Sequence, residues 1–380
     1  MMLAKFSVKN YRGFSERIEW DLATPNNYEF NTEVIKDGII KNGIIYGPNG
    51  SGKTNFGLAL FDIVNHLGQK WRKLDYYANF VYVGKLNVPV EFEYVFKDAD
   101  RIINYCYSKN NIGQLLTEKL SVDNILVFER TARTFNIDTN EFPMENTTKR
   151  NLKDNANNVS IINFLLTSYP LAKNHYLLTV LQFVDSMLWF RCLDTREFIG
   201  LDLAPTNLDE YIIQNNLVKD FSEFLHQVSD QKYQFANPRP NDKLLVCKIG
   251  GRDVIFDKII STGTNALMLL YFWIQKMRSA SFVFIDEFDA FYHFKLAFEV
   301  CKRLFALDCQ VFTSSHNTYL MTNDLLRPDC NFIVNNNKIK PLSACTQKEL
   351  RFGHNIEKLF RGNAFQLRFC LFLKEPEESR

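Results

Sequence analysis

Gly47-Pro-Asn-Gly-Ser-Gly-Lys53-Thr54 stands between a short apolar run, Gly43–Tyr46, and a segment, Thr54–His66, with apolar residues at helical spacing. The arrangement predicts a strand, a glycine-rich loop and a helix in direct succession. The loop matches G-x-x-x-x-G-K-[ST], in which glycines let backbone N–H groups turn inward around phosphate oxygens. The positive end of the helix dipole points at the same anion. The segment therefore predicts a phosphate-binding loop in an α/β fold.

The side chains of this loop have separate expected roles. Lys53 is expected to reach the β and γ phosphates of ATP, and the Thr54 hydroxyl to ligate Mg²⁺. The alternative is an ordinary glycine-rich turn, which the flanking strand and amphipathic helix disfavour. The predicted nucleotide-binding residues of the loop are Gly47, Pro48, Asn49, Gly50, Ser51, Gly52, Lys53 and Thr54.

A second acidic motif lies far along the chain. The apolar run Ser281–Asp286 reads as a buried strand that ends in two carboxylates, Asp286 and Glu287. Such a strand delivers Asp286 to the edge of a sheet, where it can bind Mg²⁺ through water, and Glu287 can polarise the attacking water. A strand that merely ends in an acidic turn is the alternative, and the phosphate loop earlier in the chain makes it the weaker one.

Two further candidates flank the acidic motif. His316 follows the apolar strand Gln310–Thr313, a position that suits a sensor of the γ-phosphate, although a lone His is more often structural. Ser261 precedes a predicted helix, where it is expected to act as N-cap, and the free N–H groups there, together with Gly263, offer an anion site. An ordinary capped helix is the alternative.

The remaining elements follow from periodicity and turn residues. The expected elements are strands at 3–8 and 17–22, an antiparallel meander over 88–140 with strands at 88–96, 102–107, 125–129 and 134–137, a loop at 143–157, helices within 159–192 and 207–229, a hairpin over 244–260 turning at Gly250-Gly251, helices at 263–278 and 293–306, and a last hairpin turning at 335–337. The expected domains are 1–140, 141–240 (mainly helical) and 241–380.

Composition limits the possible classes of protein. The 380 residues carry a net charge of +2, which does not itself predict nucleic-acid binding, and the 34 Phe supply a large core. The eight Cys have no zinc-ligand spacing and suit a reducing cytosol. The longest apolar stretch, Leu177–Phe190, is too short to span a bilayer and reads as a buried helix. No signal peptide is visible, so we expect a cytoplasmic protein without a membrane partner.

The order of these motifs resembles that of ABC-type ATPase heads of the SMC/RecF/OLD-like group. The opening Phe6–Phe14 is similar to the first strand of that group. The stretch Asp286–His293, with Asp289 and His293 at the spacing DE-x-[DE]-x-x-x-H, resembles OLD-related ATPases of bacterial anti-phage loci, and Leu359–Ala364 is loosely similar to their closing element. The expected fold is an α/β ABC-type head, with a P-loop core sheet, an antiparallel β subdomain and an inserted helical subdomain.

The resemblance also implies an assembly. In such heads two protomers enclose two ATP molecules, so Ser261 and Gly263 would contact nucleotide held by a second copy, and Asp289 would lie between the two sites. The signature here is Ser-Thr-Gly-Thr rather than Ser-Gly-Gly-Gln. Arg12 would approach the nucleotide or lie on the surface. A Q-loop glutamine is not placed; the candidates are Gln114 and Gln69.

Three functions remain open at this point. The 64 residues after His316 contain no Asp-x-Asp, so we expect no Toprim nuclease, and no heptad run predicts a long coiled coil. The leading hypothesis is an ATP-driven switch, in a homodimer or higher oligomer, that controls a separately encoded nuclease or toxin in anti-phage defence. The alternative is a RecF-like DNA-repair clamp, for which DNA is a partner. The third is a module that holds ATP as a structural ligand, which Glu287 disfavours.

Overall fold

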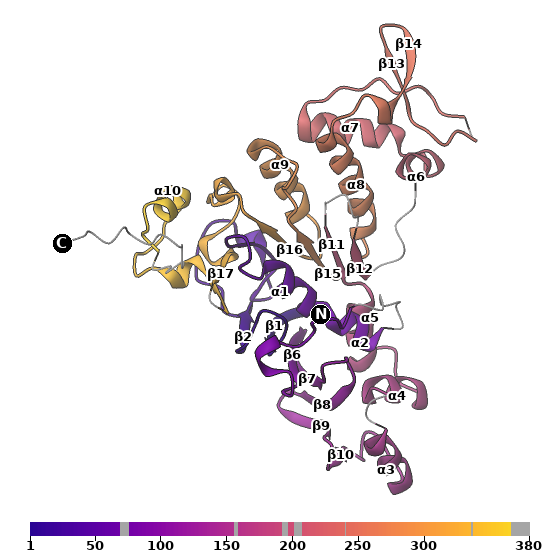
Figure 1. Ribbon diagram of the computed structural model, residues 1–380, viewed down its shortest axis with the longest axis vertical. Helices are drawn as coiled ribbons and strands as arrows, with labels where there is room; N and C mark the ends of the chain where they lie inside the picture. Colours follow the sequence, from indigo (N-terminus) through magenta and orange to yellow (C-terminus); the bar gives the residue numbers. More distant parts are fainter. Residues whose placement is uncertain are drawn as a thin grey trace, which may run out of the picture.

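The computed structural model describes residues 1–68, 76–155, 159–191, 197–200, 207–239, 241–335 and 337–365. Two seven-stranded sheets dominate these residues, one largely parallel and one antiparallel. In Figure 1 the antiparallel sheet lies below the parallel one, and two long helices lie above. The predicted α/β class, with a P-loop core sheet and an antiparallel β subdomain, is confirmed.

The central sheet contains the strand of the phosphate loop. Its order is β12-β11-β15-β16-β5-β17-β18, in which the five inner strands run parallel and the two edge strands antiparallel. Its strands are β5 (Asn42–Tyr46), β11 (Leu188–Arg191), β12 (Phe198–Gly200), β15 (Phe282–Asp286), β16 (Gln310–Ser315), β17 (Asn331–Asn335) and β18 (Lys338–Pro341). Strands buried on both faces need continuous apolar runs, which the inner strands supply, most clearly β15 with Phe-Val-Phe-Ile before Asp286.

The antiparallel sheet contains the four predicted meander strands, the two predicted strands at the start of the chain and one further strand. Its order is β10-β9-β8-β7-β6-β1-β2. Its strands are β1 (Met2–Lys9), β2 (Ile18–Asp21), β6 (Val90–Asp98), β7 (Arg101–Lys109), β8 (Leu115–Val122), β9 (Ile125–Arg130) and β10 (Phe135–Ile137). Strand β8 is absent from the sequence prediction because its charged residues, including the buried Glu118, obscure the period of two.

Aromatic side chains join the two sheets. Trp20 of β2 makes edge-to-face contacts with Phe312 of β16, at 4.5 Å between ring centroids, and with Phe332 of β17 at 5.5 Å. It also meets Phe56 of α1 (Lys53–Leu60) at 5.3 Å, and Phe56 in turn contacts Phe6 of β1 at 5.6 Å. The helix of the phosphate loop is therefore held between the two sheets. Its predicted continuation is interrupted at Phe61, after which α2 (Asp62–Leu67) begins.

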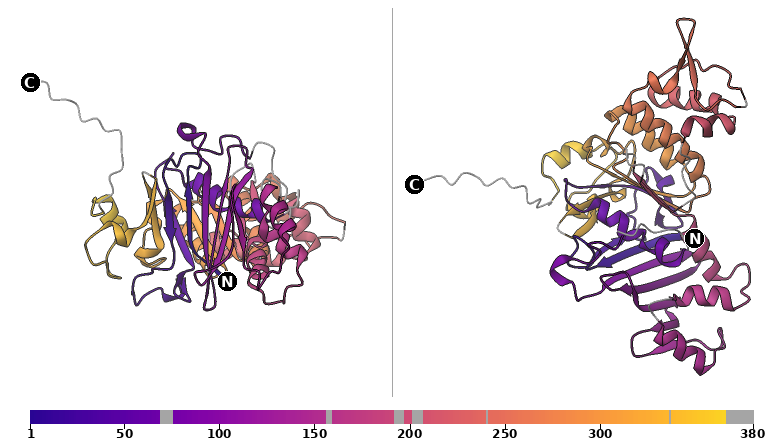
Figure 2. Two further views of the ribbon diagram at one scale, coloured as in Figure 1. Left: turned by 90° about the horizontal axis from the view of Figure 1, so that it is seen from below. Right: turned by 45° about the vertical axis from the view of Figure 1, so that its right-hand side comes forward.

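Helices α8 (Thr262–Met277) and α9 (Phe294–Phe305) cover the other face of the central sheet (Figures 1 and 2). Neighbouring residues of a strand point to opposite faces. Phe190 of β11 accordingly stacks on Trp273 of α8 at 5.1 Å, while Trp189 lies against Gly57 of α1. Both helices and their strands follow the predicted order.

The segment predicted as a mainly helical insertion departs from expectation at two places. Residues 143–157 include a helix, α3 (Asn146–Asp154), where a loop was predicted. The helices predicted within 159–192 are α4 (Ile161–Ser168) and α5 (Tyr176–Asp185), and the following Leu188–Arg191 is β11 of the central sheet. The prediction of one buried helix over 177–190 is therefore wrong at its end. A short apolar run after a helix carries no period that separates strand from helix.

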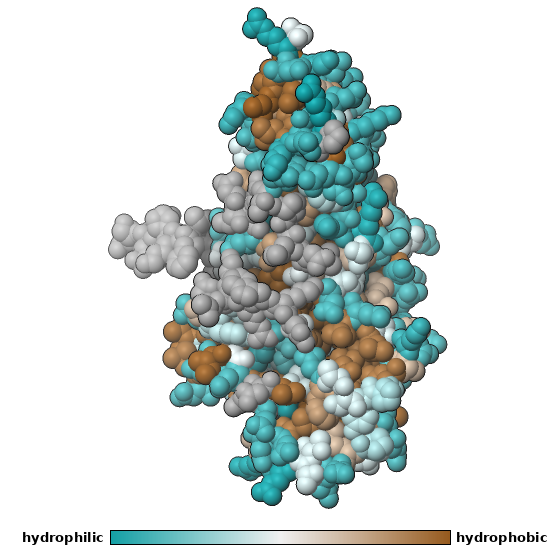
Figure 3. All heavy atoms as spheres, turned by 90° about the vertical axis from the view of Figure 1, so that its right-hand side faces the viewer, coloured by the Kyte–Doolittle hydropathy of each residue, from teal (hydrophilic) through white to brown (hydrophobic). Residues whose placement is uncertain are grey.

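A small lobe stands at the start of α8. It contains α6 (Leu208–Gln214), α7 (Val218–Ser229) and the predicted hairpin of β13 (Val246–Ile249) and β14 (Arg252–Ile255), which turns at Gly250-Gly251. The hairpin projects from the end of the molecule (Figure 1), and an apolar area is visible near that end in Figure 3. The exposed apolar residues of this lobe are Leu244, Ile249 and Ile255.

The remaining elements are short. They are β3 (Ile35–Lys36), β4 (Ile39–Ile40), α10 (Ile356–Arg361) and the 3₁₀ turns Thr32–Val34, Val83–Lys85, Phe256–Lys258, Thr318–Leu320, Pro328–Cys330 and Leu342–Cys345. Among the described residues no helix combines the length and apolar character that crossing a bilayer requires.

Candidate nucleotide-binding and hydrolysis site

The topology of the central sheet brings the predicted motifs to one edge. Strands β11, β15, β16 and β5 are consecutive neighbours and run parallel. Their carboxyl ends therefore lie side by side, which is where open α/β sheets bind ligands. This edge receives Arg191, Asp286, His316 and the phosphate loop, in that order across the sheet.

The phosphate loop has the backbone that its sequence requires. Gly50 and Gly52 adopt φ values of +75° and +98°, a region that other residues occupy only under strain. A Cβ on Gly52 would lie 2.8 Å from the ring of Phe14, so no larger residue fits there. The Ser51 hydroxyl is buried without a hydrogen-bond partner among the described residues. An unpaired buried hydroxyl together with the free N–H groups that begin α1 suits a bound anion.

Lys53 lies over the loop. Its Nζ donates to the carbonyl oxygens of Gly47, at 2.8 Å, and Pro48, at 3.2 Å. Burial lowers the pKa of Lys53 to about 8, although the nearby acidic residues raise it in part. A lysine whose charge is poorly solvated gains from an anionic partner, because the anion restores the stabilisation that burial removes.

Thr54 and Asp286 meet as the sequence predicts. The Thr54 Oγ1 donates to Asp286 Oδ2 at 2.8 Å, and Asp286 is fully buried. A hydroxyl and a carboxylate are hard oxygen ligands of the kind that Mg²⁺ prefers. No group of three His, Cys, Asp or Glu side chains that could enclose a metal is found among the described residues. The pair therefore suits a magnesium ion that takes its other ligands from water and phosphate.

A serine on the neighbouring strand fixes the acidic pair. Ser314 Oγ donates to Asp286 Oδ1 at 2.6 Å and accepts the N–H of Glu287 at 2.8 Å. Burial raises the pKa of Asp286, and the hydrogen bonds from Ser314 and Thr54 oppose that rise. Glu287 adopts φ +50°, a left-handed conformation that is uncommon for residues other than glycine, asparagine and aspartate. Sequence reasoning gave Ser314 no role, because only the pairing of β15 with β16 shows its position.

Arg191 is a site residue that sequence reasoning missed. It ends β11 as the register partner of Asp286, and its Nε lies 3.1 Å from Asp286 Oδ2. Its Nη2 donates to Glu287 Oε2 at 3.4 Å. The arginine follows the apolar run that was predicted as helix, so its place at the sheet edge was not visible from the sequence.

His316 and Asp289 both lie at the end of β16. His316 Nδ1 is 3.4 Å from Lys53 Nζ, and burial followed by the charge of Lys53 lowers the pKa of His316. Asp289 accepts a hydrogen bond from Ser315 Oγ at 2.7 Å, and burial raises its pKa. The histidine is therefore positioned beside the lysine expected to hold phosphate. The predicted place of Asp289 between two copies is not tested by a single chain.

The signature residues lie apart from the loop of the same chain. Ser261 caps α8 as predicted, since its Oγ accepts the N–H of Thr264 at 3.2 Å. A Cβ on Gly263 would lie 3.2 Å from the carbonyl oxygen of Phe291, so the start of α8 is close to the segment after the acidic strand. Neither residue forms a hydrogen bond with residues 47–54 in the part of the chain that the structure describes.

The other candidates contact residues outside the loop. The Arg12 guanidinium stacks on Tyr11 and donates to the carbonyl of Tyr76 at 3.5 Å, while the turn that contains it places Phe14 against Gly52. Gln114 accepts a hydrogen bond from Asn110 in the turn between β7 and β8. Gln69 lies outside the described residues. No glutamine is thereby assigned to the acidic pair.

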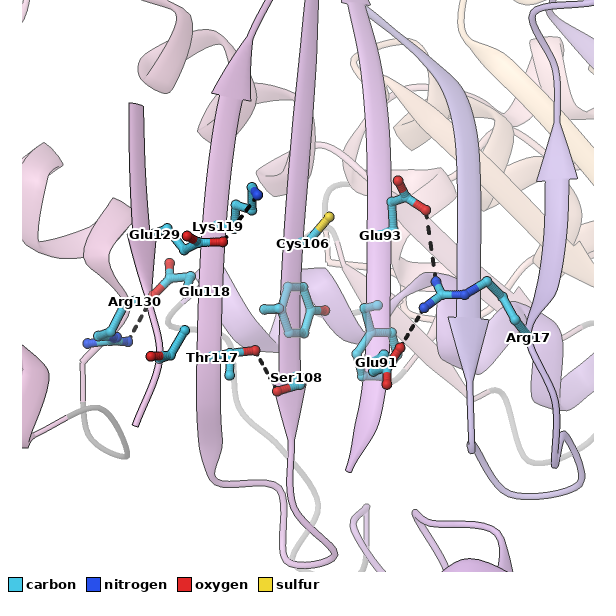
Figure 4. A pocket seen from close by; sticks show the side chains of 13 residues that line it. Arg17, Glu91, Glu93, Cys106, Ser108, Thr117, Glu118, Lys119, Glu129 and Arg130 are labelled. Atoms are coloured by element: carbon cyan, nitrogen blue, oxygen red, sulfur yellow. Dashed lines mark hydrogen bonds and ion pairs between the residues drawn. The ribbon is translucent and has the colours of Figure 1, made fainter. Parts of the chain in front are cut away.

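A hollow lies on the solvent face of the antiparallel sheet (Figure 4). Its charged side chains pair with one another. Arg17 reaches Glu91 at 2.5 Å and Glu93 at 3.9 Å, and Lys119 reaches Glu129 at 3.1 Å. The hollow lies on a different sheet from the phosphate loop and holds mutually neutralised charges, so it makes a poor anion site.

Comparison with solved structures gives distant matches. The SMC head domain from Thermotoga maritima matches with a TM-score of 0.46 at 15% identity, covering 90% of this chain and 99% of that one. An Smc head domain bound to the C-terminal domain of ScpA, from Pyrococcus furiosus, matches with a TM-score of 0.42 at 13% identity over 89% and 95%. The recombination mediator RecF with ATP matches with a TM-score of 0.36 at 14% identity over 90% and 99%. No family model and no curated protein matches the chain. Identities this low assign no activity.

Proposed function

We propose that this protein is an ABC-type ATPase that closes into a homodimer around ATP and acts as a switch for a separate effector. The observation that carries the proposal is the contact of 2.8 Å between Thr54 Oγ1 and Asp286 Oδ2, which joins the phosphate loop to the acidic strand. The two motifs are more than 230 residues apart in the chain, and a structural turn would not need them together.

The residues around this contact have different roles in the proposed hydrolysis. The backbone of residues 47–54 and Lys53 would bind the phosphates, and Thr54 with Asp286 would hold a magnesium ion, which would supply charge neutralisation at the phosphate oxygens. Glu287, half-buried and held by Ser314, orients and polarises the attacking water, and His316 lies beside Lys53 where a γ-phosphate would be held. A module that only stores ATP needs no carboxylate in the position of Glu287.

The second half of the site comes from another copy in this proposal. Ser261 and Gly263 lie at the start of α8, and neither forms a hydrogen bond with residues 47–54 of its own chain among the described residues. The N–H groups at the start of a helix of 16 residues offer positive potential to an anion. A head-to-head dimer would bring this start to the nucleotide of the partner, so ATP would join the two copies and hydrolysis would release them.

The role of the switch is inferred from the sequence resemblance to OLD-related anti-phage ATPases. Among the described residues the longest helix is α8, with 16 residues, so none of these helices is long enough for a coiled coil that bridges distant DNA. The resemblance to OLD-related ATPases favours a partner on which the ATPase acts. The proposed partner is a separately encoded nuclease or toxin, identified by purification from the native host with and without ATP.

The test is Glu287→Gln. This variant keeps the shape of the side chain and removes the base, so it should bind ATP, hydrolyse it about 100-fold more slowly and accumulate as a dimer in ATP. Size-exclusion chromatography with light scattering measures the mass. Lys53→Ala serves as the control that remains monomeric because it binds no nucleotide. Ser261→Arg should bind ATP but stay monomeric. Normal hydrolysis by Glu287→Gln would refute the assigned base, and a Ser261→Arg dimer would refute the contact between copies.

A RecF-like DNA clamp is the second candidate, favoured by the charge of the projecting hairpin. Lys248 and Arg252 flank its glycine turn and are exposed, and Lys243 and Lys258 lie at its base. Lys243 and Lys258 lie 3.9 Å from Glu210 and Asp257, respectively. The exposed Lys248 and Arg252 at the tip therefore remain as the cations that suit phosphate contacts, which weaken as salt rises. ATP-dependent binding of a DNA duplex end that is lost in Lys248→Gln/Arg252→Gln would favour the clamp over the effector switch.

A further inference from the structure

Arg191 faces three carboxylates at the edge of the central sheet. Its Nε lies 3.1 Å from Asp286, its Nη2 3.4 Å from Glu287 and its Nη1 3.7 Å from Glu197, which precedes β12. The backbone N–H of Arg191 also donates to the carbonyl oxygen of Glu197 at 3.1 Å, so Glu197 stays close whatever the side chain does. The Arg191 side chain is 23% exposed, and its buried Nε has no hydrogen-bond partner among the described residues, so its ion pair with Asp286 is not fixed by a hydrogen bond.

The pairing answers an electrostatic need. Asp286 is fully buried and Glu287 follows it directly, and two neighbouring carboxylates in a poorly solvated place repel each other. Arg191 compensates them, because its charge is permanent and its fork of donors can serve both groups at once. The acidic pair therefore carries its own cation within the chain.

This cation occupies the place expected for the metal. Arg191 approaches Asp286 Oδ2, the same oxygen that accepts the Thr54 hydroxyl and that would face Mg²⁺. A divalent ion next to that oxygen would lie a few Å from the guanidinium, and like charges so close repel strongly in a half-buried site. Arg191 and a metal ion bound directly to this oxygen would therefore compete for it.

We propose that Arg191 is a resident counter-ion that competes with the divalent cation for Asp286 and turns to Glu197 when the cation enters. The inference rests on the proposed function, since it takes the Thr54–Asp286 pair to be the metal site. Glu197 gives the displaced guanidinium a partner, so metal binding exchanges one ion pair for another and does not leave a charge unpaired. In this arrangement the competition with Arg191 raises the metal concentration at which Asp286 binds the cation.

Arg191→Gln tests the competition directly. Mn²⁺ serves as probe for Mg²⁺, and the electron paramagnetic resonance signal of free Mn²⁺ measures its binding to the nucleotide-free protein. We expect the dissociation constant of Mn²⁺ to fall roughly tenfold, because the competing cation is removed. Arg191→Lys, which keeps a cation, should stay within about threefold of the wild type.

Arg17→Gln is the matched control, since Arg17 also pairs with two glutamates, Glu91 and Glu93, but on the other sheet (Figure 4). It should leave Mn²⁺ binding unchanged. An unchanged or weaker affinity in Arg191→Gln would overturn the proposal, because the arginine would then be indifferent to the metal or would help to place its ligands.

Glu197→Gln gives a second, independent arm. It removes the proposed partner of the displaced arginine, so Mn²⁺ should bind several-fold more weakly, and an unchanged affinity would count against the exchange even if Arg191→Gln does not fold. Binding of a fluorescent ATP analogue to the wild type distinguishes failure of the proposed function from failure of the counter-ion proposal. A wild type that binds no ATP refutes the proposed function, whereas one that binds ATP with Mn²⁺ affinity indifferent to Arg191 refutes only the counter-ion.

Discussion

Glu118 on the antiparallel sheet and Asp286 on the central sheet are both buried carboxylates that face an arginine, and their surroundings differ. Glu118 accepts hydrogen bonds from the hydroxyls of Tyr105 and Ser160, each at 2.7 Å, and from the start of α4. Its partner Arg130 is as fully buried as Glu118 and lies 2.9 Å away. The Arg130 guanidinium also donates to main-chain carbonyls near α3 and α4, so this pair fastens both helices to the sheet.

Asp286 has one buried donor, Ser314, and two partners at the open edge of the sheet. Thr54 lies in the first turn of a helix at that edge, and Arg191 is part-exposed with Glu197 as a further partner. Burial raises the pKa of Asp286, although the hydrogen bonds from Ser314 and Thr54 oppose the rise. The comparison teaches how to tell two kinds of buried charge apart. An enclosed pair whose partners are all buried stabilises the fold, whereas a buried carboxylate that also faces a part-exposed arginine is prepared for a ligand.

The largest expected effect is on the stability of the enclosed pair. Glu118→Ala leaves Arg130 buried without its counter-charge, so the free energy of unfolding should fall by about 3–5 kcal/mol. Urea denaturation followed by circular dichroism measures it. ATP affinity of the protein that remains folded should not change, because the pair lies on the other sheet.

Lys119→Ala provides the control on the same strand. Lys119 pairs with Glu129 at 3.1 Å on the solvent face, and its side chain is half exposed, at 50%. Its removal should change the free energy of unfolding by less than about 1 kcal/mol. A loss below about 1 kcal/mol in Glu118→Ala as well would show that the enclosed pair does not stabilise the sheet.

The same kind of change at Asp286 should act on hydrolysis and spare stability. Asp286→Asn removes a magnesium ligand, so the rate of ATP hydrolysis should fall about 100-fold or more, a loss near 3 kcal/mol in transition-state stabilisation. Stability should stay within about 1 kcal/mol of the wild type, because the amide avoids burying a charge and Arg191 keeps two other carboxylates. A colorimetric phosphate assay and urea denaturation measure the two effects. A stability loss as large as that of Glu118→Ala would remove the distinction between the two regions.

Sequence reasoning predicted the central sheet edge better than the antiparallel sheet, for a physical reason. The phosphate loop, the acidic strand and the N-cap at Ser261 are set by residues close in sequence, so a short pattern is enough to identify them. Arg191 and Ser314 reach Asp286 only because β11 and β16 lie beside β15, and strand neighbours cannot be read from a local pattern.

The buried network of the antiparallel sheet was also invisible in the sequence. Glu118 sits in β8, whose alternation is weak, and it meets Arg130 of β9 and Ser160, which precedes α4, across the sheet. A charged residue inside a strand normally indicates a solvent-facing position. Only the geometry shows that these charges are turned inward and paired. The helix α3 was missed for a related reason, because its Asn-rich sequence is typical of a loop.

The smallest expected effect is the uptake of protons by Lys53 when ATP binds. Burial places the pKa of Lys53 at about 8, against an ordinary value of 10.5, so above pH 8 the free protein holds this lysine largely uncharged. Phosphate favours the charged form, and ATP binding should therefore take up roughly three quarters of a proton at pH 8.5 and less than about a tenth at pH 7. Calorimetry in two buffers with different ionisation enthalpies measures this uptake.

The stability of the nucleotide-free protein should also depend on the protonation of Lys53. Between about pH 8 and 10.5 the unfolded chain binds more protons at Lys53 than the folded one, so this lysine makes the free energy of unfolding rise with pH in that window. Below pH 8 both states are protonated and the burial cost is present in full.

Lys53→Met should abolish this contribution, while His316→Ala should leave the uptake at pH 8.5 intact, since burial keeps the pKa of His316 below its usual value. Proton uptake equal at both pH values would mean that Lys53 is already charged before ATP arrives. The charges of the central site would then be balanced within the chain, as those of the Glu118–Arg130 pair are. The proposed difference between the two regions would be refuted.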